Sequence, residues 1–210
     1  TGAATAYFLK KSGAGRVLLL DRKGIAAGGT GRSAAIIRQH YSTALLARLT
    51  LEGIDILKSL PDETGNDPGF SQVGWFFLVP PDLVDGAREN ISLQQGIGVR
   101  TSFVDQAEYA ERLPWLNPDG VGAVVHEPDG GYVDPVMATE ALVNGFKKLG
   151  GEVRTNTPCR ELIREGNKIT GVILDEGPVT ANAVVNAAGP WSHLLAASAG
   201  LELPLRVVRE

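Results

Sequence analysis

Two residues near the start of the chain have the types and the spacing of a dinucleotide-binding site. Gly2 begins a predicted helix, and Asp21 ends a predicted strand 19 positions later. The N-terminus of a helix presents unpaired N–H groups to a pyrophosphate, and an acid about 20 residues further on binds ribose hydroxyls. A strand and two more glycines normally precede these residues, so we expect the natural protein to begin before Thr1. The alternative is an ordinary terminal glycine and a strand-end turn.

The segments around these residues predict an α/β protein. A short helix over residues 3–12 and a strand Arg16–Asp21, which holds four consecutive apolar residues, are typical of a buried parallel sheet. Further helices are predicted over residues 43–60, where Pro61 would end the helix, near 82–95, from Asp105 to Pro114 and from Asp134-Pro135 to Leu149. Further strands are predicted at Val73–Val79, Val121–Val125, Val153–Asn156, Leu162–Ile163, Ile169–Leu174 and Ala183–Asn186. Residues 61–69 indicate a domain boundary. This order favours an α/β domain that an α+β domain interrupts.

The composition excludes several classes of protein. The chain has 210 residues and a formal net charge of −4, which disfavours a nucleic-acid-binding protein. No apolar stretch is long enough for a transmembrane helix, and no signal peptide is visible, so we expect a cytoplasmic protein. The single cysteine, Cys159, excludes an intrachain disulfide, and no metal-ligand spacing is present.

Four sequence stretches form a set of motifs in a fixed order. They are Thr1–Leu9 with the strand that ends at Asp21, Gly28–Arg38, Gly130–Pro135 and Val184–Ser192. Together they resemble the FAD-dependent amine oxidoreductases of the D-amino-acid oxidase-like family, and Ile36-Ile37-Arg38 is most similar to the sarcosine oxidase or dehydrogenase branch. The resemblance covers nearly the whole chain, which looks truncated at both ends. It implies an FAD-binding, Rossmann-like domain of the glutathione-reductase-like kind, interrupted by an α+β substrate domain.

The resemblance also implies how the chain is divided. We expect residues 1–70 and 131–200 to form two parts of the FAD-binding domain. Residues 71–130 would form the first part of the substrate domain, and residues 201–210 would begin a return to it.

The resemblance assigns FAD contacts to several residues. Gly2 would pack the helix that faces the pyrophosphate, Asp21 would bind the adenosine ribose, and Arg22 would flank it. The other predicted cofactor-binding residues are Gly29, Thr30, Arg32, Ser33, Ala34, Cys159, Ala187, Ala188 and Gly189. Backbone amides and glycines suit such contacts because they allow close approach to phosphate oxygens. Cys159 would lie near the adenine, so we expect no covalent flavin bond there.

Two residues are candidates for the substrate site. In the resemblance Arg38 binds the substrate carboxylate, and a planar guanidinium suits that role because it binds a carboxylate through two parallel hydrogen bonds. A surface or salt-bridge arginine is the alternative. His40 would contact the substrate or the flavin edge, with a purely structural histidine as the alternative.

These assignments predict an FAD-dependent amine oxidoreductase. A hydride would pass to the flavin from the carbon beside the nitrogen of an amino acid or N-methyl amino acid, such as sarcosine, glycine or proline, while Arg38 orients the substrate. Two alternatives stay open. One is an FAD-dependent hydroxy-acid or glycerol-3-phosphate dehydrogenase-like enzyme, and the other is a non-catalytic flavin-binding subunit of a larger oxidase. A partner subunit or a homo-oligomer is compatible with either.

Overall fold

The computed structural model describes residues 1–208, apart from the side chain of Gln106, and the chain divides into two compact units. Unit 1 contains residues 1–33, residues 60–68 and the described chain from Pro135 onward. Unit 2 contains Ala34–Ser59 and Gly69–Asp134. Residues 34–59, which we expected to belong with the first FAD-binding segment, therefore pack with unit 2. The expected segment 201–210 ends on residues 209–210, which lie outside the described residues.

Unit 1 contains a parallel pair of strands, two packed helices and an antiparallel sheet. Its elements are α1 (Gly2–Lys11), β1 (Leu18–Leu20), the 3-10 turn η1 (Thr30–Arg32), the last turn of α2 (Ala44–Thr64), α5 (Pro135–Lys148), β8 (Glu152–Arg154), β9 (Glu161–Glu165), β10 (Lys168–Leu174), β11 (Gly177–Thr180), the 3-10 turn η3 (Gly189–Trp191) and α6 (Ser192–Ala197). Strand β1 pairs in parallel with β8, and the antiparallel sheet has the order β11-β10-β9. Unit 1 thus contains the βα arrangement that the sequence predicts.

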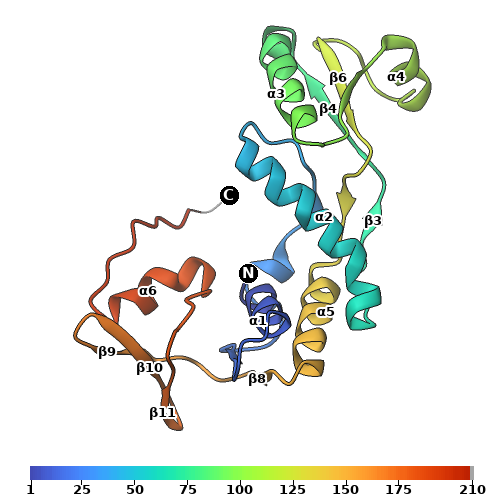
Figure 1. Ribbon diagram of the computed structural model, residues 1–210. Helices are drawn as coiled ribbons and strands as arrows, with labels where there is room; N and C mark the ends of the chain where they lie inside the picture. Colours follow the sequence, from blue (N-terminus) through green and yellow to red (C-terminus); the bar gives the residue numbers. More distant parts are fainter. Residues whose placement is uncertain (209–210) are drawn as a thin grey trace. The chain divides into compact units, whose positions relative to one another are not determined.

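Helices α1 and α5 lie side by side in unit 1 (Figure 1). A Cβ atom on Gly145 of α5 would lie 2.8 Å from Cε2 of Tyr7 and 2.6 Å from Cγ2 of Thr64, so only glycine allows this packing. The Tyr7 hydroxyl donates a hydrogen bond of 2.6 Å to Glu63, and burial together with this carboxylate raises the pKa of Tyr7 to about 12. These contacts attach the end of α2 to unit 1.

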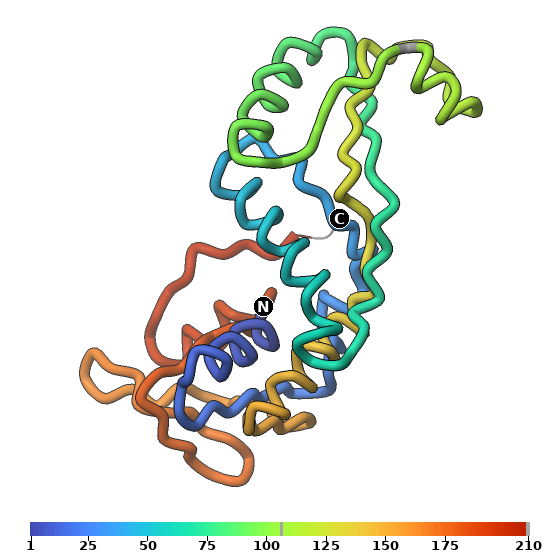
Figure 2. Tube along the Cα trace, turned by 45° about the vertical axis from the view of Figure 1, so that its right-hand side comes forward, coloured from blue at the N-terminus to red at the C-terminus, as the bar shows by residue number. Residues whose placement is uncertain are grey.

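Unit 2 contains two small antiparallel sheets and a covering helix. Its elements are β2 (Ile36–Ile37), the first turns of α2, β3 (Ser71–Gln72), β4 (Trp75–Val79), the 3-10 turn η2 (Pro81–Leu83), α3 (Val84–Gly96), β5 (Ser102–Val104), α4 (Gln106–Arg112), β6 (Ala123–Glu127) and β7 (Gly131–Tyr132). The sheets have the orders β4-β6-β5 and β2-β7-β3. Figure 2 shows the paired strands β4 and β6 running side by side. Val79, Ile91 and Val125 form the buried core between α3 and the sheet β4-β6-β5.

Several predicted element boundaries are confirmed. The carboxylate of Asp105 accepts a hydrogen bond of 2.8 Å from the backbone N–H of Glu108, as in a capping box. Helix α5 begins at Pro135 and ends before Gly150, whose φ of +78° suits the end of a helix. Among residues 1–208, no helix is both long and apolar enough to cross a membrane.

The prediction that Pro61 ends the second helix is wrong, because α2 continues through this proline to Thr64. Proline lacks the N–H group that would bond within the helix. The last turn is held instead by the Thr64 hydroxyl, which donates a hydrogen bond of 2.7 Å to the carbonyl of Leu60, and by Lys148, which donates to the carbonyl of Thr64. These hydrogen bonds compensate for the missing one.

The predicted strand Ala183–Asn186 is also wrong. This segment forms no strand, because no strand of the described chain pairs with it, and a strand exists only through its neighbour's hydrogen bonds. The predicted strand Val73–Val79 begins only at Trp75, as β4, after Gly74, whose φ is +77°. The next predicted strand, Val121–Val125, lies two residues later as β6.

Candidate functional site

The N-terminus of α1 is the first part of a candidate cofactor site in unit 1. Thr1 makes no side-chain hydrogen bond to the first turn, and that turn contains no acidic residue. The first N–H groups of a helix have no partner within the helix, and the helix dipole favours an anion there. A Cβ atom on Gly2 would lie 3.3 Å from Cβ of Ala187 and 3.7 Å from Cδ1 of Leu19. The structure therefore brings together Gly2 and Ala187, two predicted cofactor residues.

Asp21 lies directly after β1 with an exposed side chain. Its backbone N–H donates to the carbonyl of Arg154 (3.0 Å), and its carbonyl accepts from the N–H of Thr157 (2.9 Å). These bonds extend the pairing of β1 with β8. Cys159 follows two residues after Thr157, and burial raises the pKa of its thiol, which stays protonated and unreactive. Asp21 and the segment that leads to Cys159 thus lie at the same end of the strand pair.

The loop that follows Asp21 lies against η3. The guanidinium of Arg22 lies 4.1 Å from the centroid of the Trp191 ring, which is cation–π geometry. A Cβ atom on Gly28 would lie 3.9 Å from Cζ3 of the same ring. Gly189 in η3 has a φ of +54°, a conformation that favours glycine. Arg22 and Gly189, both predicted to contact the cofactor, are therefore joined through Trp191.

Gly31 is a residue that the sequence analysis missed. Its N–H donates a hydrogen bond of 3.0 Å to the carbonyl of Ala26, and a Cβ atom on it would overlap that carbonyl oxygen. Ala26 itself has a φ of +57°, so the loop closes tightly at this point. The predicted cofactor residues around Gly31 are all exposed; they are Gly29, Thr30, Arg32, Ser33 and Ala34. The density of glycine in this loop was the signal that could have identified Gly31.

Asn186 is a second residue that the sequence analysis missed. Its side-chain amide donates a hydrogen bond of 2.8 Å to the carbonyl of Ser192 and accepts one of 3.3 Å from the N–H of Ala188. Asparagine often holds a turn through its own neighbouring backbone in this way. Asn186 thereby fixes the backbone of the predicted cofactor residues Ala187, Ala188 and Gly189.

Arg38 directly follows β2 in unit 2, and its side chain is exposed. The guanidinium lies 5.7 Å from the ring centroid of Tyr41 and 6.0 Å from that of Phe77. No acidic side chain within residues 1–208 forms an ion pair with it. An arginine that rests on aromatic rings without a carboxylate partner keeps its hydrogen-bond donors available for a ligand.

The ring of His40 stacks on Phe77, with 4.0 Å between the ring centroids and 26° between the planes. Its Nδ1 atom is buried and has no hydrogen-bond partner among the described residues. Burial, and to a lesser extent the charge of Arg38, lower the pKa of His40. His40 is therefore neutral at neutral pH and can donate or accept a hydrogen bond.

Glu127 is a third residue that the sequence analysis missed. It is the last residue of β6, its exposed fraction is 0%, and its Oε1 atom accepts a hydrogen bond from the backbone N–H of Gln39. Burial raises the pKa of Glu127 to about 7, although Gln39 and the charge of Arg38 oppose this shift. An acid before Pro-Asp-Gly-Gly is typical of an exposed turn, so the sequence alone gave no sign that Glu127 is buried.

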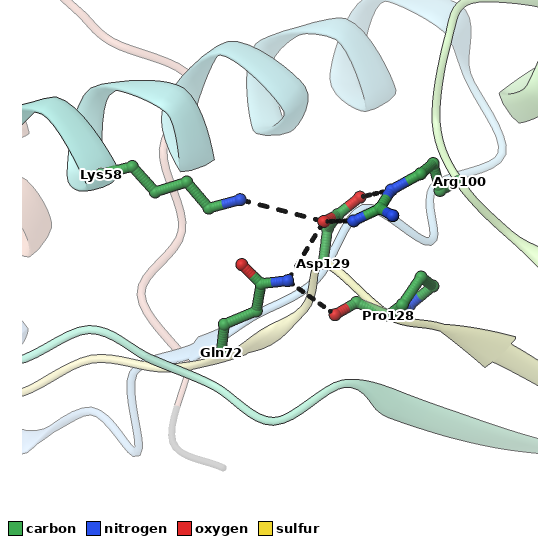
Figure 3. Close-up of polar contacts among 5 residues, drawn as sticks. All are labelled: Lys58, Gln72, Arg100, Pro128 and Asp129. Carbon is green, nitrogen blue, oxygen red and sulfur yellow. Dashed lines mark hydrogen bonds and ion pairs between the residues drawn. The ribbon is translucent and has the colours of Figure 1, made fainter.

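Asp129 lies on the turn that directly follows Glu127, and it connects several elements (Figure 3). Its carboxylate accepts hydrogen bonds from the Arg100 guanidinium, at 2.7 Å from Nε, and from the Gln72 amide at 3.2 Å. The ammonium of Lys58 lies 3.8 Å away. Arg100 is the main reason why the pKa of Asp129 is lowered. Asp129 thus joins α2, β3 and the residues before β5 to the turn between β6 and β7.

Comparison with known proteins identifies the class to which this fold and these residues belong. Residues 1–210 match the family described as DAO, FAD dependent oxidoreductase, and the chain belongs to this family. This confirms the resemblance that the sequence motifs indicate.

The chain is also similar to individual proteins. The chain is 30% identical over 205 residues to 4-methylaminobutanoate oxidase (formaldehyde-forming) from Paenarthrobacter nicotinovorans, and 29% identical over 205 residues to the mitochondrial dimethylglycine dehydrogenase of Rattus norvegicus. Each match covers 97% of this chain and about a quarter of the relative, 25% and 24% respectively. The crystal structure of L-proline dehydrogenase from P. horikoshii is similar with a TM-score of 0.87 at 30% identity, over 94% of this chain and 52% of that chain. The predicted fold class is therefore confirmed.

The residues of unit 1 fit the flavin dinucleotide on which this family depends. The N-terminus of α1 carries no side-chain cap that would compete with a diphosphate. The exposed carboxylate of Asp21, directly after β1, can accept hydrogen bonds from ribose hydroxyls. Because Gly2 has no side chain, the start of α1 can lie close to Ala187.

Proposed function

We propose that the protein is an FAD-dependent enzyme that oxidises the C–N bond of an amino acid or N-methyl amino acid. The observation that carries this proposal is the exposed Arg38, which rests on Tyr41 and Phe77 and has no carboxylate partner among residues 1–208. The names of two relatives, a 4-methylaminobutanoate oxidase and a dimethylglycine dehydrogenase, support a methylated amine that also carries a carboxylate. The chain spans only about a quarter of the length of these relatives.

In this proposal unit 1 is the cofactor unit. The N–H groups at the start of α1 bind the diphosphate, and Asp21 accepts hydrogen bonds from the ribose. Backbone groups of the loop around Thr30 and of residues 187–189 contact the rest of the cofactor, and backbone near Cys159 lies on the adenine side. When bound, FAD supplies the acceptor for the hydride that leaves the carbon beside the amine nitrogen.

Unit 2 is the substrate unit in this proposal, and Arg38 and His40 are its substrate residues. Arg38 binds the substrate carboxylate through two parallel hydrogen bonds and thereby orients the amine end. His40 has a lowered pKa and is neutral at neutral pH, so it adds a hydrogen bond without a second positive charge. The aromatic ring of Phe77 supports both side chains.

An anaerobic absorbance titration of the full-length protein tests this function. We expect sarcosine, dimethylglycine or proline to bleach the flavin band, because these amines donate a hydride. The amide of sarcosine is a matched control, since it keeps the oxidisable C–N bond but lacks the carboxylate that Arg38 would bind. It should bleach the flavin only at a much higher concentration.

Three results would contradict the proposal. Bleaching by lactate or glycerol 3-phosphate and by no amine would assign the protein to the hydroxy-acid or glycerol-3-phosphate class. FAD binding without reduction by any of these compounds would favour a non-catalytic flavin-binding subunit. A protein unable to take up FAD would contradict both the cofactor and the substrate assignments.

A further inference from the structure

The buried carboxyl of Glu127 lies directly beneath the backbone that carries Arg38 and His40. Its Oε1 atom accepts a hydrogen bond from the N–H of Gln39, the residue between them, and the N–H of His40 also interacts with this carboxyl. Glu127 itself is fixed by the sheet, because β6 pairs with β4 and places it opposite Trp75. One acid in a rigid strand thus holds the segment on which both predicted substrate residues stand.

Gly130 allows this close packing. A Cβ atom on Gly130 would lie 3.2 Å from Oε1 of Glu127 and 3.1 Å from the carbonyl oxygen of Ile37. The Gly130 carbonyl accepts a hydrogen bond of 2.9 Å from the N–H of Gly74, so the turn after β6 has little freedom to move. The carboxyl of Glu127 is therefore enclosed by backbone on several sides.

The enclosed groups are not all paired. Oε2 of Glu127 is buried and has no hydrogen-bond partner among the described residues, and the same holds for both polar atoms of the fully buried Gln39 side chain. Buried polar atoms in a purely structural arrangement are normally satisfied. One oxygen of the Glu127 carboxyl is therefore held by the backbone, and the other has no group in the described part of the chain that fixes it as ionised or protonated.

The charged groups around Glu127 come from several elements. Arg38 attracts its negative form, and Asp129 on the adjoining turn repels it. The charge of Asp129 is itself compensated by Arg100 and by Lys58 of α2. His40 is neutral at neutral pH because burial lowers its pKa. Arg38 is therefore the cation that most directly stabilises the ionised form of Glu127.

We propose that Glu127 is a positioning residue for the substrate: its carboxyl fixes the backbone of Arg38–His40, and its charge competes with the substrate carboxylate for Arg38. This inference rests on the proposed function, since it assumes that Arg38 binds a carboxylate. When Glu127 is neutral, Arg38 attracts the substrate carboxylate with its full charge. When Glu127 is ionised, the two carboxylates repel each other and share one cation.

The sign of the resulting pH dependence follows from linkage. A bound carboxylate disfavours the ionised form of Glu127, so binding is accompanied by proton uptake, and affinity falls as the pH rises. Burial raises the pKa of Glu127 to about 7, which places this change between roughly pH 6 and 8.

Calorimetric titration of the full-length, FAD-loaded protein with acetate tests the proposal. Acetate carries the carboxylate but no amine to titrate or oxidise, and acetamide is the neutral control ligand. Comparing two buffers of different ionisation enthalpy gives the number of protons taken up. We expect the dissociation constant of acetate to rise at least about fivefold from pH 6 to pH 8, with proton uptake near pH 7. Glu127→Gln keeps the acceptor for Gln39 but cannot ionise, so it should show neither effect.

The control variant is Glu89→Gln, which makes the same chemical change at an exposed position of α3 in the same unit. It should behave like the natural protein. An infrared difference spectrum of the natural protein, with and without acetate at pH 7, gives a second test that needs no variant. Acetate should increase the signal of a protonated buried carboxyl.

The outcomes separate this inference from the proposed function. Acetate binding that is independent of pH, or a pH dependence that persists in Glu127→Gln, would overturn the role of Glu127 and point to His40. If the amines fail to bleach the flavin while acetate still shows Glu127-dependent proton uptake, the proposed function fails and the role of Glu127 stands. No acetate binding at pH 6 would overturn the carboxylate role of Arg38 and this inference with it.

Discussion

The two units form their candidate sites by different chemical means. In unit 1 the candidate cofactor residues act mainly through the backbone: a helix N-terminus at Gly2, a loop closed at Gly31 and a bend at Gly189. In unit 2 the candidate substrate residues Arg38 and His40 act through their side chains, and a buried acid, Glu127, holds the backbone between them. Backbone N–H groups suit a phosphate that is always ionised, whereas a side-chain carboxyl of adjustable charge can regulate a ligand. The variants below test this difference.

Among the variants with a partial effect, the largest effect is expected from Arg38→Gln. Loss of a charge-assisted, two-fold hydrogen bond should lower kcat/KM for sarcosine or dimethylglycine about 100-fold. The FAD content should not change, because Arg38 belongs to the substrate unit in this account. Steady-state kinetics and the flavin absorbance of the purified full-length protein measure both quantities. Arg48→Gln, an exposed arginine on α2, is the matched control and should keep its activity. Equal losses in the two variants would argue against a specific role for Arg38.

The next effect is expected from Gly31→Ala. The added Cβ atom would overlap the carbonyl oxygen of Ala26, so the loop must open. Overpacking of this kind costs about 2 kcal/mol, so the affinity for FAD should fall about 30-fold. Gly24→Ala lies in the same loop, where a Cβ atom meets nothing within 4 Å, and it should bind FAD normally. Fluorescence titration of the FAD-free protein measures both constants. A normal affinity in Gly31→Ala would show that the loop geometry does not matter for the cofactor.

A smaller effect is expected from Asp21→Asn. The backbone N–H of Lys23 donates a hydrogen bond of 2.8 Å to the carboxylate of Asp21. Asparagine keeps an oxygen that can accept this bond but lacks the negative charge. A ribose hydroxyl binds a carboxylate more strongly than an amide, so the affinity for FAD should fall about fivefold. Asp62→Asn is the control at another exposed position of unit 1. Unchanged FAD affinity in Asp21→Asn would mean that this side chain does not bind the ribose.

The smallest effect is expected from Asp129→Asn, which should lower the free energy of unfolding by about 1 kcal/mol at pH 7. Arg100 lowers the pKa of Asp129 in the folded state. Its stabilising contribution is therefore present above the ordinary pKa of aspartate and is lost as the pH falls through the folded-state value. Urea unfolding at pH 7 and near pH 3 should show a smaller difference between the variant and the natural protein at the lower pH. A difference of the same size at both values would contradict the ion-pair explanation.

Local signals in the sequence predicted much of the fold. The capping acid Asp105 and the pair Asp134-Pro135 mark helix starts through their immediate neighbours, so they need no tertiary information. Long-range contacts explain the errors. Helix α2 passes Pro61 because residues distant in sequence hold its last turn, and Ala183–Asn186 is no strand because it lacks a partner among the described residues.

The candidate site was predictable to a similar degree. The spacing from Gly2 to Asp21 and the motif that contains Arg38 can be read from the sequence alone. The contribution of Glu127 is not, because its importance comes from burial beneath a segment 88 positions earlier in the chain. Gly31 was missed for a related reason, since only the folded loop shows which of its glycines cannot carry a side chain.

The central claim is that the N-terminus of α1 holds the FAD diphosphate, and the FAD affinity of Gly2→Val tests it most directly. A valine side chain would fill the narrow space beside Ala187, where even a Cβ atom lies at 3.3 Å, whereas Gly15→Val adds the same side chain where nothing lies within 4 Å of the Cβ position. We predict that the full-length Gly2→Val protein is purified without FAD and does not take it up, while Gly15→Val retains it. Equal FAD affinity in the two folded variants would contradict the account.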